Sequence, residues 1–246
     1  AYSRGDGAAM RRELNIPERA FVVGHVGRLA PEKNLEFLAD AVARFVRSRS
    51  NAHFLVVGSG PSEEPIRRLF ERHRVLERLH MPGSRSGQAL VDAYHAMDVF
   101  AFASQSETQG MVLVEAMAAG RPVVAIDAAG VREVVVDRQN GPMLASQSRR
   151  AFLPRLDGVA SSAQHDRERL EQKARETAGR FSTAACAERA LEAYQQTIAA
   201  ERQARNPNEG TLESVTRLIG VEWELWTNVA RATGRMVQGR HLWKMP

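Results

Sequence analysis

Two glutamates and two basic residues have the types and spacing to hold an anion that carries hydroxyl groups. Glu107 and Glu115 are separated by seven residues, with Gly110 between them, and Arg28 and Lys33 follow an earlier apolar run. Carboxylates accept hydrogen bonds from hydroxyl groups, a guanidinium binds phosphate bidentately, and an ammonium acts as a point charge. This chemistry fits a diphosphate with hydroxyl-bearing groups attached.

The stretch that must position the two glutamates predicts strand, helix and strand. An apolar run at 99–103 leads through a polar turn into a helix-forming run at 111–119, which Gly120 and Pro122 end before a second apolar run at 123–126. This order is typical of a parallel β-α-β crossover. In open parallel sheets ligands bind beyond the carboxyl ends of the strands, where helix N-termini present unpaired N–H groups.

The same unit recurs along the chain. Apolar runs at 21–29, 53–61 and 79–81 are each followed by apolar residues at helical spacing, and a last βα-type pair covers 130–136 and 141–144. Alternating strands and helices predict an α/β fold, a Rossmann-like doubly wound parallel sheet of about six strands, followed by C-terminal helices.

Composition changes divide the chain into three parts. Residues 1–19 are polar with one short helix and form a lead-in or inter-domain segment. Residues 20–205 are the α/β domain with its closing helices. The closing helices are expected because the chain becomes helical and strand-free after residue 146. Residues 206–246 are a C-terminal amphipathic helical extension that begins with an Asn-Pro-Asn-Glu-Gly break.

Composition narrows the class of protein. A hydrophobic fraction of 43% can form a sizeable core, and no apolar run is long enough to span a membrane. The single cysteine, Cys186, excludes an intrachain disulfide and favours a reducing, cytoplasmic location. The net charge of +5 suggests anionic partners, and charge alone leaves nucleic acid, acidic lipid and phosphorylated small molecules open.

Several familiar motifs are absent from the sequence. No GxGxxG follows the first strand and no GxxxxGK[ST] occurs, which disfavours a dinucleotide oxidoreductase or a P-loop NTPase. There is no Asp-x-Asp clamp, and the seven histidines lack metal-ligand spacing, so each is interpreted as a core or surface residue. We therefore expect a site with no metal and no cofactor.

The two basic residues also have a simpler interpretation, which involves no ligand. Arg28 and Lys33 could be solvated loop residues paired with Glu32, because exposed ion pairs are common and contribute little. Their expected position on the same sheet edge as Glu107 favours binding instead. The Gly58-Ser59-Gly60 turn is by itself a weak signal, more often a tight turn than a ligand site.

Four segments in this order carry a family resemblance: GHVGRLAPEKNLEFL, FLVVGSGP, DVFAFASQSETQGMVLVEAMAAGRPVVA and GVREVVVDRQNG. Together they resemble the C-terminal, donor-binding half of a GT-B retaining glycosyltransferase, in the Glu-x7-Glu group that includes sucrose synthases. The resemblance covers residues 21–200, and its most specific part is the pair Glu107 and Glu115 around Gly110. Ser59 departs from it, because the family often has an acidic residue there.

The resemblance implies a role for each site residue. Arg28 and Lys33 would contact the diphosphate of a UDP- or GDP-linked sugar and stabilise the leaving group, with Glu107 beside the transferred sugar as the third catalytic residue. Glu115 would bind the ribose hydroxyls. The remaining donor-binding residues would be Gly27, Gly58 and Gly60, then Met81, Pro82 and Gly83 near the base, and Gln109, Gly110, Met111, Val112 and Leu113 at the phosphates.

The family pattern also implies a partner. Its members bind the acceptor mainly through an N-terminal half, and no segment before Phe21 predicts a second sheet. We therefore expect a chain that binds a nucleotide sugar but transfers little without that half, and no nucleic-acid partner. Two alternatives stay open, a non-catalytic nucleotide-sugar-binding or partner-binding module and a nucleotide-sugar epimerase.

The C-terminal helix expected at 211–238 has two interpretations. Its apolar stripe suits docking onto the N-terminal half. Its excess of arginine and lysine after Glu224, with Trp243, would also suit peripheral contact with the inner membrane face.

Overall fold

One sheet of six parallel strands organises the computed structural model, which describes residues 2–137 and 139–204. The strand order is β3-β2-β1-β4-β5-β6, so the predicted parallel sheet of about six strands is confirmed. The strands are β1 (Phe21–Val26), β2 (Ala52–Val57), β3 (Leu79–Gly83), β4 (Val99–Phe102), β5 (Val123–Ile126) and β6 (Met143–Leu144).

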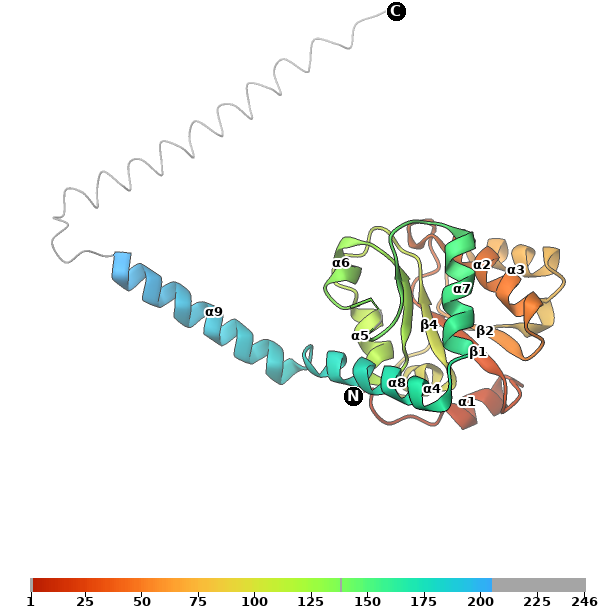
Figure 1. The fold of residues 1–246 in the computed structure, drawn as a ribbon, viewed down its shortest axis with the longest axis horizontal. Coiled ribbons are helices and arrows are strands. Elements are labelled where there is room, and N and C mark those ends of the chain that lie inside the picture. Colours follow the sequence, from red (N-terminus) through yellow and green to blue (C-terminus); the bar gives the residue numbers. More distant parts are fainter. Residues whose placement is uncertain (1, 138, 205–246) are drawn as a thin grey trace, which may run out of the picture. The chain divides into compact units, whose positions relative to one another are not determined.

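Helices cover both faces of the sheet (Figure 1). One face packs against α2 (Leu35–Ser48), α3 (Glu63–Arg72) and α7 (Arg149–Ala160), and the other against α1 (Gly7–Glu13), α4 (Gly87–Ala96), α5 (Met111–Ala118) and α8 (Gln164–Gly179). The short helices are η1 (Pro31–Lys33), η2 (Leu76–Arg78) and α6 (Ala129–Arg132), and α9 (Thr183–Ala204) is the last described element.

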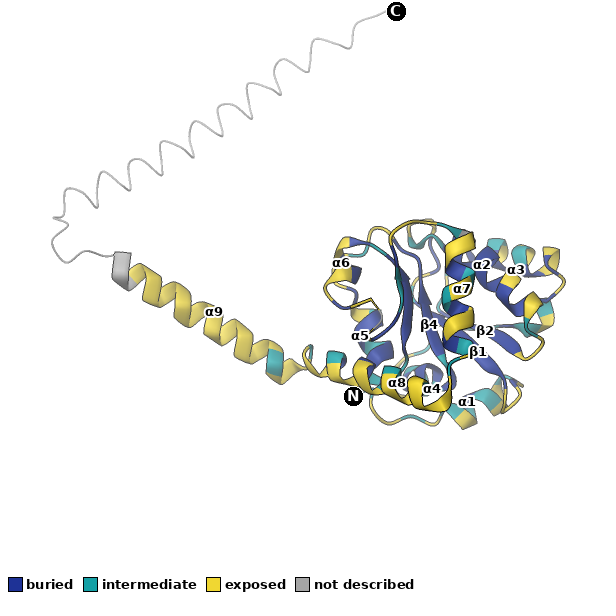
Figure 2. Cartoon of the chain, in the orientation of Figure 1, coloured by how far each residue is buried: buried dark blue, intermediate teal, exposed yellow. Residues whose placement is uncertain are grey.

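Apolar residues on both faces of each central strand explain this layering. In β4, Val99 and Ala101 join the core beneath α2 and α7, while Phe100 and Phe102 join the core beneath α4 and α5. Successive side chains of a strand point to opposite faces, so a strand covered on both faces reads as a continuous apolar run. Figure 2 shows the strands as buried and the outer helix faces as exposed.

The strand order reverses between β1 and β4. The chain runs from β1 outward to β2 and β3, then returns to place β4 on the other side of β1. The paired residues of β1 and β4 are Val23 with Val99 and Gly24 with Phe100, and no pairing continues beyond them. The strands therefore separate at their carboxyl ends, and such a switch point is where ligands bind in open α/β sheets.

The last part of the sheet differs from the predicted arrangement. The pair expected at 130–136 and 141–144 is the four-residue helix α6 followed by the two-residue strand β6. An isolated bridge joins Asp137 to Gly141 between them. The prediction of a helical, strand-free chain after residue 146 holds as far as residue 204, and the break at 206–210 and the helix at 211–238 lie outside the described residues.

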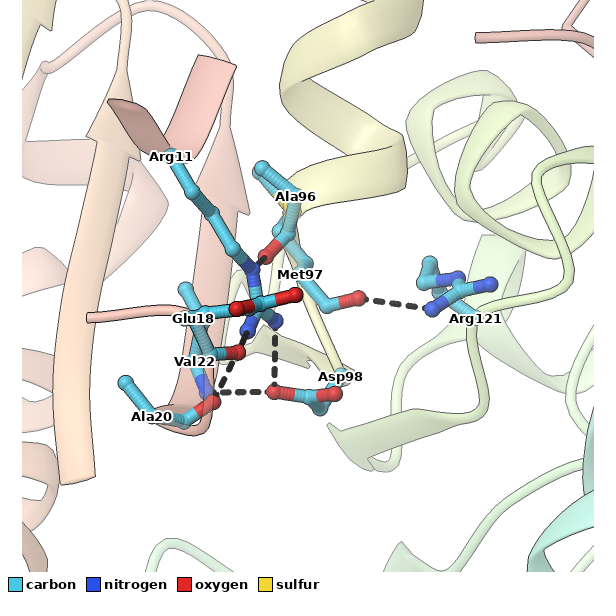
Figure 3. Close-up of polar contacts among 8 residues, drawn as sticks. All are labelled: Arg11, Glu18, Ala20, Val22, Ala96, Met97, Asp98 and Arg121. Carbon is cyan, nitrogen blue, oxygen red and sulfur yellow. Dashed lines mark hydrogen bonds and ion pairs between the residues drawn. The ribbon is translucent and has the colours of Figure 1, made fainter. Parts of the chain in front are cut away.

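Arg11 connects the N-terminal segment to the end of the sheet at which β1 begins (Figure 3). Its guanidinium donates to the carboxylate of Asp98 at 2.9 Å, and that carboxylate also accepts from the amide of Val22 at 2.7 Å. The Arg11 guanidinium also donates to three carbonyl oxygens, those of Ala96 (2.9 Å), Glu18 (2.8 Å) and Ala20 (3.0 Å). The segment is thus fixed by hydrogen bonds that cap the ends of neighbouring elements.

The chain divides into two units after residue 186. The sheet and its covering helices form the first unit. The described part of the second unit, residues 187–204, lies in α9, where Leu191, Tyr194 and Ile198 are exposed. Within the described residues, no helix combines the length and apolar character needed to cross a membrane.

Candidate functional site

The loops that follow β1 and β4 meet at the switch point. Lys33, in the first loop, lies 3.0 Å from Glu107 in the second, measured between Nζ and Oε2. The side-chain amide of Asn34 donates to the carbonyl of Ala103 at 3.1 Å. The hydroxyl of Ser104 donates to the carbonyl of Glu32 at 3.4 Å. Two of the predicted site residues, 74 positions apart, are thus in direct contact.

Glu107 is held as a carboxylate. Its side chain is 15% exposed and accepts hydrogen bonds from Lys33 and from the amide of Gly110, the latter at 3.1 Å. The amide of Gln109 donates to the same carboxylate. Partial burial alone would raise the pKa of Glu107, but the hydrogen bonds from Lys33 and the two amides outweigh it and lower the pKa. Glu107 is therefore an anionic acceptor at neutral pH.

Gly110 is required by the shape of the Glu107 loop. It precedes α5 with φ of 63°, in the left-handed region that favours glycine, and an added Cβ would lie 2.9 Å from the carbonyl oxygen of Gly130. Gly130, which sequence reasoning did not single out, donates its amide to the carbonyl of Glu107 at 3.1 Å. A hydrogen bond from helix α6 thus holds the Glu107 loop in place.

The start of α5 is only partly free to bind an anion. The sequence predicted that the Leu113 amide would bind a phosphate. In the structure this amide already donates to the carbonyl of Gly110 at 2.9 Å. Met111 and Val112 are the first two residues of the helix, and the Met111 side chain is 49% exposed. Unpaired N–H groups at a helix N-terminus attract anions.

Arg28 lies at the same sheet edge but not in contact with Glu107. Its guanidinium is exposed and forms an ion pair with Glu32, the arrangement that the simpler interpretation expected for it. Arg28 also lines a pocket of about 360 Å³ at the ends of β1 and β2. The other lining residues are Val26, Gly27, Val57, Gly58, Ser59, Ser84, Arg85 and Leu90.

Gly58 and Gly60 allow the loops after β1 and β2 to touch. An added Cβ at Gly58 would lie 1.9 Å from the carbonyl oxygen of Gly27, and one at Gly60 would lie 2.5 Å from that of Leu29. Both glycines have positive φ, 146° and 150°. Their residue type is therefore explained by backbone packing.

The predicted base-binding residues lie beside this pocket. Met81, Pro82 and Gly83 end β3, and the carbonyl of Gly83 accepts from the amide of Gly58 at 3.0 Å. The residues that line the pocket come next, Ser84 and Arg85. Sequence reasoning missed Arg85, which forms an ion pair with Glu13 of α1 at 2.9 Å.

Glu115 is one turn inside α5 and has a protein partner. The hydroxyl of Tyr94, in α4, donates to Glu115 Oε2 at 2.8 Å. Burial and the nearby carboxylate raise the pKa of Tyr94 far above its usual range, so its proton stays in place. Sequence reasoning assigned Tyr94 only to a helix core, because nothing in helical spacing shows that its hydroxyl reaches a carboxylate in another helix.

A metal-binding cluster is not found in the described part of the chain. Within residues 2–137 and 139–204, no group of three or more histidine, cysteine, aspartate or glutamate side chains is arranged to hold a metal ion. The charged groups named at the switch point include the cations Arg28 and Lys33 and the carboxylates Glu107 and Glu115. Together with the α5 N-terminus, they form an edge that offers both donors to phosphate and acceptors to hydroxyl groups.

Comparison with known proteins gives a family match over most of this region. The model of the family described as "Glycosyl transferases group 1" matches residues 6–177. One curated relative, a D-inositol 3-phosphate glycosyltransferase from Segniliparus rotundus, is 33% identical over 204 residues, which are 80% of this chain and 44% of the relative. The chain spans about half the length of the curated relatives it matches.

Solved structures share the fold. HepE from Anabaena, crystallised in complex with UDP-glucose, has a TM-score of 0.68 and 25% identity, over 78% of this chain and 52% of that one. The C-terminal domain of a glycosyl transferase group 1 family protein (LpcC) from Francisella tularensis has a TM-score of 0.62 and 20% identity. The match covers 72% of this chain and 92% of that domain, so the shared fold is the fold of a C-terminal domain.

Proposed function

Because this chain belongs to the glycosyl transferases group 1 family, we propose that its switch-point site binds the nucleotide sugar from which a sugar is transferred. The resemblance to the C-terminal domain of a GT-B glycosyltransferase is confirmed for family and fold.

The contact between Lys33 and Glu107 is the observation that carries the proposal. It brings an ammonium and a carboxylate from two loops to the crevice between β1 and β4. A nucleotide sugar has a diphosphate that needs cations and a sugar that needs acceptors, only a few ångströms apart. Lys33 would turn to the diphosphate on binding, and Glu107 would then accept hydrogen bonds from sugar hydroxyls.

Stabilisation of the charge on the leaving group would lower the barrier to transfer. As the bond from the sugar to the diphosphate breaks, negative charge builds on the leaving group, and Arg28, Lys33 and the Met111 and Val112 amides would stabilise it. We propose that these groups act without a metal and that the sugar is transferred with retention of configuration. Glu115, oriented by Tyr94, would accept from the ribose hydroxyls.

The rest of the donor fits the adjoining pocket. We propose that the nucleoside enters the space lined by Gly58, Ser84 and Arg85, with a UDP- or GDP-linked sugar as the donor. The crystal structure of HepE in complex with UDP-glucose supports a nucleotide sugar of this class, because HepE shares the fold at 25% identity.

An acceptor would need a further surface. We propose that transfer requires a partner domain that binds the acceptor and closes over the donor site, and that this chain alone binds donor with little turnover. The full protein would act in the cytoplasm, with its C-terminal segment docked onto the acceptor-binding half and peripheral contact with the inner membrane face as the alternative for that segment.

Binding measurements with matched variants test the proposal. Calorimetric titration with UDP, GDP and their sugars should give saturable binding to the wild type. Lys33→Met should weaken it by about 10- to 100-fold, since a charge-assisted hydrogen bond contributes about 1.5–3 kcal/mol. Lys173→Met removes the exposed Lys173–Glu176 pair of α8 and should leave affinity unchanged.

Product analysis separates the alternatives. When the acceptor-binding half is supplied, a transferase consumes nucleotide sugar and forms a glycosylated product. A binding module leaves the nucleotide sugar intact, and an epimerase returns it with inverted configuration at one sugar carbon. Failure of every nucleotide to bind the wild type would reject the donor-site proposal.

A further inference from the structure

His25 fills the gap where β1 and β4 separate. It is the residue after Gly24, the last residue of β1 that pairs with β4. Its ring centroid lies 6.0 Å from that of Phe100 and 6.2 Å from that of Phe102, and the three rings are nearly parallel. The side chain is 1% exposed. An imidazole thus occupies the crevice where a strand ladder would otherwise continue.

The protein backbone determines which ring nitrogen of His25 carries the proton. Nδ1 lies 3.1 Å from the carbonyl oxygen of Ala101, which can only accept a hydrogen bond. Nδ1 must therefore be the donor. Burial and the nearby Lys33 ammonium lower the pKa of His25 to about 4, so the ring is neutral at physiological pH. Nε2 then has a free lone pair.

Nε2 has no hydrogen-bond partner within the described residues, although the atom is buried. An acceptor of this kind costs free energy unless it is paired, so an unpaired one in a native site needs an explanation. It faces the end of β1: a Cβ added to Gly27 would lie 3.7 Å from Nε2 and within 4 Å of no other atom. Gly27 itself lines the pocket that Arg28 and Gly58 share.

We propose that His25 Nε2 accepts a hydrogen bond from a hydroxyl group on the sugar of the bound nucleotide sugar. The proposal rests on the donor site argued above and adds a residue to it. His25 lies beside β4, where Nδ1 contacts the Ala101 carbonyl, and it comes one residue before the strand end that leads to Gly27 and Arg28. It would act as a specificity-determining residue, since only a sugar with a hydroxyl at that point satisfies it.

The chemistry of the acceptor selects a hydroxyl over a phosphate. Phosphate oxygens at neutral pH accept hydrogen bonds, as does unprotonated Nε2, so the two would repel. Protonating the ring to reverse this is opposed by burial and by Lys33. A hydroxyl group supplies the missing donor with no change in charge. Because Nε2 is buried in the free chain, the groups that cover it must shift when the donor binds.

Nitrogen NMR of the imidazole tests the proposal on wild-type protein. With labelled histidine, Nε2 of His25 should show the shift of an unprotonated nitrogen in the free chain. UDP or GDP alone should leave that shift nearly unchanged. UDP-glucose or GDP-mannose should move it upfield as the nitrogen accepts a hydrogen bond. An unchanged shift in the presence of bound nucleotide sugar would overturn the proposal, and so would Nε2 protonation by UDP alone.

Two substitutions give a binding readout. In His25→Asn the side-chain amide can still donate to the Ala101 carbonyl, but the Nε2 acceptor is gone. It should lose about 5- to 10-fold in affinity for the nucleotide sugar and keep its affinity for the nucleoside diphosphate. His25→Gln, whose amide oxygen can reach the Nε2 position, should recover part of the loss. Equal losses for both ligands would indicate a structural role only.

A second buried histidine, His53, provides the control variant. His53→Asn changes another buried histidine, which pairs with His80 at 2.9 Å at the start of β2, and should leave both affinities unchanged. If His25→Asn binds the nucleotide sugar as tightly as the wild type does, His25 contributes nothing and only this inference fails. If neither ligand binds, the donor site itself is wrong.

Discussion

The hydroxyl of Tyr94 donates a hydrogen bond of 2.8 Å to Glu115, and this contact joins two helices that lie side by side on one face of the sheet. Tyr94 is fully buried, so its hydroxyl has few alternative partners. The carboxylate of Glu115 is thereby held in one orientation near the start of α5. A ligand that uses Glu115 would meet an acceptor that is already oriented, which reduces the entropy lost on binding.

Tyr94→Phe should weaken nucleotide binding without unfolding the protein. It removes only the hydroxyl, so the ring still packs, and the loss of orientation at Glu115 should reduce affinity for UDP or GDP about fivefold, near 1 kcal/mol. Calorimetry and thermal unfolding on the same samples check this. Tyr194→Phe, at a 69% exposed position in α9, is the matched control. Lower stability with unchanged affinity would mean that the contact serves packing alone.

Gly58→Ala should destabilise the fold strongly. The new Cβ would lie 1.9 Å from the Gly27 carbonyl oxygen at a φ of 146°, and the combined overlap and strain should cost about 2–5 kcal/mol. Gly158→Ala makes the same change in α7, with no atom within 4 Å of the new Cβ, and should stabilise by about 0.5–1 kcal/mol. Urea unfolding measures both. Similar effects of the two variants would refute the packing explanation for Gly58.

Arg11→Met should lower stability without changing the donor site. The substitution leaves Asp98 without its charged partner and three carbonyls without a donor, for a cost of about 2–4 kcal/mol in this partly buried setting. Arg12→Met, at an exposed neighbouring position, should cost little. Urea unfolding gives the free energies, and nucleotide affinity measured below the transition should match the wild type. A normal unfolding curve for Arg11→Met would show that the segment is held by its apolar contacts.

Stability should fall as pH is lowered from about 6.5 to about 4. The pKa of His25 is about 4 in the folded chain against 6.5 when unfolded, so the unfolded state takes up the proton first, and the difference is worth about 3 kcal/mol. The pKa values of His53 and His80 are lowered too and add to the same slope. Below 4.5, protonation of Glu107, whose folded pKa is lowered, removes further stability.

Urea unfolding at several pH values checks this dependence. His25→Asn should flatten the slope between pH 6.5 and 4 without abolishing it, because His53 and His80 still titrate. It should leave the loss below pH 4.5 intact. A wild-type slope unaffected by the substitution would mean that His25 titrates normally in the folded chain.

Local patterns in the sequence were sufficient for the sheet and for the shared location of two site residues. Alternating apolar runs and helical spacing predicted parallel strands, and placing Lys33 and Glu107 at the carboxyl ends of two of them put both on one edge. Their direct contact depends on β4 returning beside β1. That return follows from the usual layout of open α/β sheets, which periodicity alone does not reveal.

Contacts between elements far apart in sequence were not predictable in the same way. Tyr94 and Arg11 each occupy an ordinary helical position, and only the tertiary fold brings the hydroxyl of Tyr94 to Glu115 in α5 and the guanidinium of Arg11 to Asp98. His25 was interpreted as a core or surface histidine, and burial bears out the first. Its unpaired Nε2 depends on where the pairing of β1 with β4 ends.

Hydrogen exchange with and without a nucleotide sugar tests most directly whether the two loops form one donor site. Saturating UDP-glucose or GDP-mannose should slow exchange together in peptides that cover 27–34 and 104–113, because one ligand contacts the Lys33 loop and the start of α5. Peptides at 11–20 and 160–167, at the opposite end of the sheet, should be unaffected. Protection confined to one of the two loops, or found only at the opposite end, would contradict a shared donor site.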